Sequence, residues 1–148
     1  MNSVQTIHEK TMLVGDCTLE GLIAFPGFTH YYDKENDGYQ PDEETIGALK
    51  PLVQGLKIVI VMGTWCGDSL RQVPRFLKVI QELEIPENDV KIIAVDQTKR
   101  SFEEQVAVLN IDKVPTFIFS FDGREVGRIV EMPMETLEKD WYYLLTNE

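Results

Sequence analysis

Several residue types are scarce in this chain, and each shortage excludes a class of protein. Two cysteines and two histidines are too few for a disulfide framework, a zinc cluster or a histidine-based triad, so we expect no metal site. Lysine and arginine number 14 against 25 aspartates and glutamates, which gives a formal net charge of −11. This balance argues against nucleic acid and anionic membranes as partners, because both need basic surfaces. No apolar run approaches the length of a membrane span.

The composition is otherwise that of an ordinary globular protein. The chain has 148 residues, of which 43% are hydrophobic and 26% charged, enough for one domain with one core. The first residues show no basic segment followed by an apolar one, so we expect no signal peptide. The scarcity of cysteine favours a cytoplasmic protein.

The stretch from residue 57 to residue 74, KIVIVMGTWCGDSLRQVP, is central to the chain. Residues 58–62 are apolar and rich in β-branched side chains, and Gly63 follows them, which is typical of a buried strand. A helical pattern begins at Cys66. Unpaired backbone N–H groups and the positive end of the helix dipole favour a thiolate at that position. The sequence therefore predicts that Cys66 is a nucleophile.

Turn residues and hydrophobic periodicity divide the rest of the chain into elements. We expect a short strand at 12–14, a helix at 18–25 ended by Pro26-Gly27, a loop at 28–39, helices at 41–53 and from 66, a strand at 90–95, a helix at 101–110, strands at 117–121 and 125–130, and a helix at 134–145. From residue 57 onward the alternation of strand and helix implies parallel pairing with helices on both faces of a sheet.

Three features in this order resemble the thioredoxin family. Trp65-Cys66-Gly67 is similar to the family's Trp-Cys-Gly, and Pro74 lies at the position of its helix-kinking proline. Val114-Pro115-Thr116 resembles the segment that contains the family's cis-proline. The resemblance implies a thioredoxin-like α/β fold, with a central mixed sheet of four to five strands, helices on both faces and an antiparallel C-terminal hairpin. It covers about residues 55–146. We therefore expect one domain over residues 1–148, with a thioredoxin core at 56–146. Residues 1–55 would form an extended N-terminal segment or a divergent first βα unit.

The family's Cys-x-x-Cys is replaced here by Cys66-Gly67-Asp68-Ser69. A hydroxyl at Ser69 is expected to hydrogen-bond the Cys66 sulfur and favour its thiolate, but it cannot attack a mixed disulfide. Resolution then requires a small thiol such as glutathione, a partner protein, or Cys17, which is otherwise a buried structural cysteine. Asp68 suits the helix dipole but repels a thiolate, so its effect opposes that of Ser69.

The resemblance also implies how a substrate binds. In the family the cis-proline lies against the active cysteine, so the backbone of Val114 would pair with an extended substrate chain. Trp65 would form an apolar wall beside the sulfur, although packing in the core is the alternative for this residue. The expected substrate site comprises Trp65, Gly67, Asp68, Val114 and Pro115, and the expected catalytic residues are Cys66 and Ser69.

Two functions follow from this reading. The first is a monothiol thiol–disulfide redox protein that forms mixed disulfides with protein or small-molecule thiols through Cys66. It would need no cofactor beyond glutathione or another low-molecular-weight thiol as co-substrate. The alternative is a redox-inactive thioredoxin-fold module that only binds polypeptides.

Overall fold

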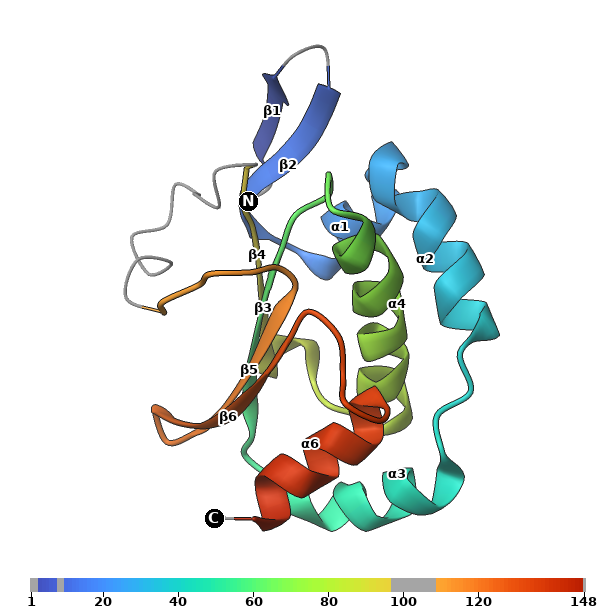
Figure 1. Ribbon diagram of the computed structural model, residues 1–148, viewed down its shortest axis with the longest axis vertical. Helices are drawn as coiled ribbons and strands as arrows, with labels where there is room; N and C mark the ends of the chain where they lie inside the picture. The colour runs from blue at the N-terminus through green and yellow to red at the C-terminus, as the bar shows by residue number, and fades with distance from the viewer. Residues whose placement is uncertain (1–2, 8–9, 97–108, 148) are drawn as a thin grey trace.

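A computed structural model of the protein describes residues 3–7, 10–96 and 109–147 (Figure 1). The strands are Ser3–Ile7 (β1), Lys10–Cys17 (β2), Lys57–Met62 (β3), Val90–Ala94 (β4), Thr116–Phe121 (β5) and Arg124–Val130 (β6). The helices are Leu19–Ala24 (α1), Pro26–Gly38 (α2), Glu43–Leu49 (α3), Gly67–Glu82 (α4) and Leu137–Thr146 (α6), with 3-10 turns at Lys50–Leu52 and Glu87–Asp89.

The strands form one mixed sheet in the order β1-β2-β4-β3-β5-β6. At its centre β3 pairs in parallel with β4 and antiparallel with β5, and β5 pairs antiparallel with β6 across the turn at Asp122-Gly123. The predicted mixed α/β sheet and its C-terminal hairpin are confirmed. The sheet has six strands rather than four to five because the N-terminal segment forms the β1–β2 hairpin, and β2 pairs with β4.

The two faces of the sheet carry different apolar clusters. Ile60 and Met62 of β3 belong to a large core, which residues of all five described helices complete on one side of the sheet (Figure 1). Phe76 stacks there on Phe117, with ring centroids 4.0 Å apart. The alternating residue Val61 points to the opposite face. It belongs to a smaller cluster with Ile93, Val95 and Val114, against which Trp65 and Cys66 pack.

The segment predicted as a loop at residues 28–39 is part of helix α2, so that prediction is wrong. Pro26 does not end a helix but stands in the first turn of α2, where its missing N–H costs nothing. Phe28 and Asn36 lie two turns apart and are both buried, and the Asn36 side-chain amide donates to the Pro74 carbonyl at 3.0 Å. Contacts with α4 therefore stabilise a helix whose polar composition suggests a loop.

A buried carboxylate joins α6 to the chain between α2 and α3. Glu138 is only 2% exposed, and its two oxygens accept hydrogen bonds from the Tyr39 hydroxyl at 2.7 Å and the Asp42 backbone N–H at 2.8 Å. Burial and the adjacent carboxylate raise the pKa of Tyr39 above its ordinary value. This network could not be predicted from local sequence patterns, because Glu138 is 99 residues from Tyr39 and 96 from Asp42.

The remaining helices agree with the sequence within a few residues. Thr18 caps α1 and Asp42 caps α3, through hydrogen bonds from backbone N–H groups three residues on. The helix predicted at 101–110 lies almost entirely outside the described residues. Within the described part of the chain, no helix combines the length and apolar character needed to cross a membrane. The same residues contain no cluster of three or more histidine, cysteine, aspartate and glutamate side chains suited to a metal ion.

Candidate active site

Cys66 lies where the central strand passes into helix α4. It is the N-cap residue of α4, with extended backbone angles (φ −98°, ψ 122°), and its N–H donates to the Gly63 carbonyl at 3.1 Å. The thiol is free and half-buried. Its sulfur lies 3.5 Å from the carbonyl oxygen of Val114, to which it donates a weak hydrogen bond. The structure thus brings together the two segments that the sequence predicted to meet.

The segment opposite the sulfur, Val114-Pro115, is fixed by contacts with the rest of the protein. The Val114–Pro115 peptide bond is cis, and the Val114 side chain is buried in the smaller apolar cluster. The Pro115 carbonyl accepts a hydrogen bond from the Glu131 backbone N–H at 2.7 Å, which ties this turn to the end of β6. Among the described residues the Val114 N–H has no hydrogen-bond partner.

Ser69 does not contact the sulfur in the way the sequence suggested. Its side chain is fully buried, and its hydroxyl oxygen accepts a hydrogen bond from the Gly63 backbone N–H at 3.2 Å. No hydrogen bond joins Ser69 to Cys66 in the part of the chain that the structure describes. The reason is geometric: in the first turn of α4 this side chain faces the end of β3. Ser69 therefore holds the strand–helix turn in place.

Trp65 packs against the rest of the protein, as one of the two interpretations of this residue expects, and part of its surface stays exposed. Its indole N–H donates to the Val95 carbonyl at 2.8 Å, and the ring packs against the smaller cluster. The ring lies so close over Gly63 that a Cβ there would be 2.5 Å from an indole carbon. The side chain is nevertheless only half-buried. Trp65 therefore holds a partly exposed apolar ring in a fixed position in the residue before Cys66.

Thr64 is a positioning residue that the sequence analysis missed. It is 7% exposed, and its hydroxyl oxygen accepts a hydrogen bond from the Leu13 backbone N–H at 3.1 Å. This bond fixes the turn before Cys66 to strand β2. The only signal in the sequence was the place of a hydroxyl residue between a buried strand and a tryptophan.

Gly67 and Asp68 are the first residues of helix α4. Gly67 is exposed, and a Cβ there would meet no atom within 4 Å outside its chain neighbours and its own helix backbone. One Asp68 carboxylate oxygen lies 3.1 Å from the Arg71 guanidinium. Because this cation is adjacent, the Asp68 carboxylate repels a neighbouring thiolate less than the sequence alone suggests. Arg71 is thus another residue that the sequence reasoning did not single out.

Cys17 is remote from this arrangement. It is 7% exposed and belongs to the large core on the helix-covered face, whereas Cys66 packs on the opposite face of the sheet. Its thiol donates to the Gly15 carbonyl at 3.4 Å, and burial raises its pKa to about 11. Both cysteines are free. Cys17 has the properties of the buried structural cysteine rather than of a resolving thiol.

Comparisons with known proteins show similarities of sequence and of fold. A sequence profile of the thioredoxin family matches residues 29–141. Thioredoxin-like protein R548 of Acanthamoeba polyphaga mimivirus is 28% identical over 92 residues, which cover 62% of this chain and 64% of that protein. The match therefore spans slightly less than two thirds of this relative's length.

One solved structure shows a similar fold, and a second gives a weaker match. A Pseudomonas aeruginosa protein of unknown function superposes with a TM-score of 0.51 at 13% identity, covering 89% of this chain and 86% of that one. The Drosophila melanogaster thioredoxin Deadhead gives a TM-score of 0.40 at 18% identity, covering 57% of this chain and 75% of that one.

Proposed function

This chain belongs to the thioredoxin family, and from that premise we propose that it is a monothiol thiol–disulfide redox protein with Cys66 as its nucleophile. The observation that carries the proposal is the placement of one half-exposed sulfur at the N-terminus of α4, 3.5 Å from the Val114 carbonyl. The positive end of the helix dipole favours an anion at this end of α4, and no other segment of the described chain fills the space beside Gly67.

The reaction proceeds by two exchanges. The Cys66 thiolate attacks one sulfur of a substrate disulfide, so that a Cys66–substrate disulfide forms, the original S–S bond breaks and the other half leaves as a thiolate. A second, external thiolate then attacks the substrate sulfur of the mixed disulfide. This step releases the Cys66 thiolate and leaves the substrate joined to the external thiol. Each exchange breaks one S–S bond and forms another, so one half of the substrate leaves as a thiolate while the external thiol ends in a disulfide with the other half. A second external thiol then releases that half and completes the two-electron reduction.

The external thiol is needed because the chain has no second thiol near Cys66. Ser69 occupies the resolving position with a hydroxyl, and Cys17 lies on the other face of the sheet. A low-molecular-weight thiol such as glutathione fits the role, because the open first turn at Gly67 leaves access for a small nucleophile. The alternative to a low-molecular-weight thiol is a cysteine thiol of a partner protein.

The remaining site residues position the substrate. An extended substrate chain would donate to, or accept from, the Val114 backbone as an added strand does, because its N–H has no partner among the described residues. The half-exposed face of Trp65 would cover apolar groups beside the disulfide. Pro115 holds the Val114 carbonyl toward the sulfur through its bond from Glu131, and Asp68 with Arg71 forms the charged rim.

The test is turnover of a small disulfide, bis(2-hydroxyethyl) disulfide, with reduced glutathione as the only reductant. We expect the wild type and Cys17→Ser to show equal activity and Cys66→Ser to show none. Cys17→Ser is the matched control, because it removes the same thiol group from a site that the proposal leaves inactive. Absence of turnover in the wild type, with Cys66 fully reduced and the protein folded, would instead favour the redox-inactive polypeptide-binding module.

A further inference from the structure

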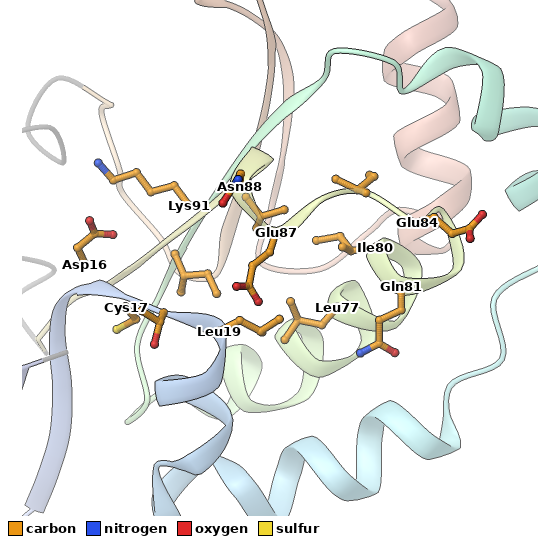
Figure 2. Close-up of a pocket in the computed structure, with 14 residues that line it drawn as sticks. Asp16, Cys17, Leu19, Leu77, Ile80, Gln81, Glu84, Glu87, Asn88 and Lys91 are labelled. Carbon is orange, nitrogen blue, oxygen red and sulfur yellow. The ribbon is translucent and has the colours of Figure 1, made fainter. Parts of the chain in front are cut away.

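A second concave site lies on the helix-covered face of the sheet, away from Cys66. It is a groove of about 620 Å³ between the end of β2, the start of β4 and the last turns of α4. Figure 2 shows Leu19, Leu77 and Ile80 along its floor, with Cys17 at one end. A volume of this size is typical of ligand sites, which are mostly apolar with a few polar groups at the edge.

The groove has an acidic rim. Its charged lining residues are Asp16, Glu84, Glu87 and Lys91, which together carry an excess of negative charge. In Figure 2 Asp16 and Lys91 lie at one end and Glu84 at the other, and the Glu87 carboxylate lies between them over the apolar floor. An occupant that buries aliphatic surface here must therefore also bring positive charge along the length of the groove.

We propose that this groove binds a basic amphipathic segment of a partner polypeptide. Its apolar side chains would pack on Leu19, Ile85 and Val90, the half-buried apolar residues of the lining, and its lysines or arginines would pair with Asp16, Glu84 and Glu87. A second copy of this chain does not fit, because each copy carries a net charge of −11 and two acidic surfaces repel. Cys66 does not line this groove, so the binding proposal can be tested independently of the redox proposal.

Binding by a groove of this size is weak and depends on salt. A single segment held in one groove is expected to form a transient complex, because stable protein interfaces bury roughly 1,200–2,000 Å². The ion pairs at the rim are exposed, and each contributes about 0.5 kcal/mol, or roughly a factor of two in affinity. Two of them together account for about a fivefold change.

The experiment uses the full chain and two synthetic helical peptides with the same leucine stripe, one carrying lysines on its polar face and the other glutamates. Fluorescence anisotropy at low ionic strength should show binding of the lysine peptide only. The double variant Glu84→Gln/Glu87→Gln should bind it about fivefold more weakly. The matched control Asp37→Asn/Glu135→Gln removes the same charge at exposed sites outside the groove and should bind as the wild type does.

Two further measurements locate the peptide. Leu19→Ala, at a half-buried site in the first turn of α1, should weaken binding without loss of the fold, as checked by thermal unfolding. In a Cys66→Ser chain the lysine peptide should also slow alkylation of Cys17, which lines the groove. Equal losses in the two double variants, binding of both peptides, binding of spermidine with no preference for the peptide, or no binding at all would each overturn the proposal.

Discussion

Ser69→Ala separates a structural from a chemical role for the hydroxyl in the Cys-x-x-Ser motif. Ser69 is fully buried, and its oxygen is the acceptor for the backbone N–H of Gly63, which is buried as well. Alanine leaves that N–H without a partner. An unsatisfied buried donor costs about 1–3 kcal/mol. We expect a loss of about 2 kcal/mol in the free energy of unfolding, which lowers Tm by about 4–8 °C in a domain of this size.

The assay pairs urea unfolding with the rate of alkylation of Cys66 by iodoacetamide. Because the hydroxyl makes no hydrogen bond to the sulfur, the folded variant should alkylate at a rate close to that of the wild type. Ser120→Ala is the control for stability: Ser120 is a half-buried residue of β5 whose hydroxyl has no partner in the described part of the chain. It should change stability by no more than about 0.5 kcal/mol.

The opposite pattern would refute this reasoning. If Ser69→Ala unfolds at the same urea concentration as the wild type but its Cys66 alkylates much more slowly, the hydroxyl acts on the sulfur. The role predicted from the sequence alone would then be the correct one, and the bond to Gly63 would be of little consequence.

Three other perturbations test the surroundings of the site. Burial raises the pKa of the Cys17 thiol from 9.0 to about 11. The protonated thiol therefore contributes about 3 kcal/mol to the free energy of unfolding below pH 9, and this contribution is lost as the pH rises through 11. The free energy of unfolding measured in urea should fall more steeply over this pH range in the wild type than in Cys17→Ala. Tyr39→Phe removes a donor to the buried Glu138 carboxylate and should lower the free energy of unfolding by about 1.5–3 kcal/mol, measured in urea. Gly63→Ala would place a Cβ 2.5 Å from the Trp65 ring, so it should lower the free energy of unfolding by about 1–3 kcal/mol. The displaced ring should also shift the tryptophan emission and slow thiol–disulfide exchange at Cys66.

The position of Cys66 in the fold was predictable because it depends on local rules. An apolar β-branched run ending at Gly63 and a helical pattern after it place Cys66 at a strand–helix junction, and the structure has it there as the N-cap of α4. Asp122-Gly123 likewise adopts the two positive φ angles that a tight hairpin requires, 50° and 78°. Such features depend only on the few residues around them, so they can be predicted from the sequence.

The predictions from sequence were wrong or incomplete where contacts between distant parts of the chain determine the structure. Helix α2 reads as a loop from its composition, yet the bond from Asn36 to Pro74 and the ion pair of Glu35 with Arg75 at 2.9 Å join it to α4. The partner of the Ser69 hydroxyl depends on which way the first turn of α4 faces the sheet, and no pattern in the sequence gives that rotation. The same limit applies to Glu138, whose partners belong to the chain around α3.

The most direct measurement is the intact mass of the folded protein after incubation with glutathione disulfide, followed by peptide mapping. We predict one glutathionyl adduct on Cys66, no adduct on the buried Cys17, persistence of the adduct in the absence of thiol, and its release by reduced glutathione. A folded protein that remains unmodified, or one whose modified residue is Cys17, would contradict the account.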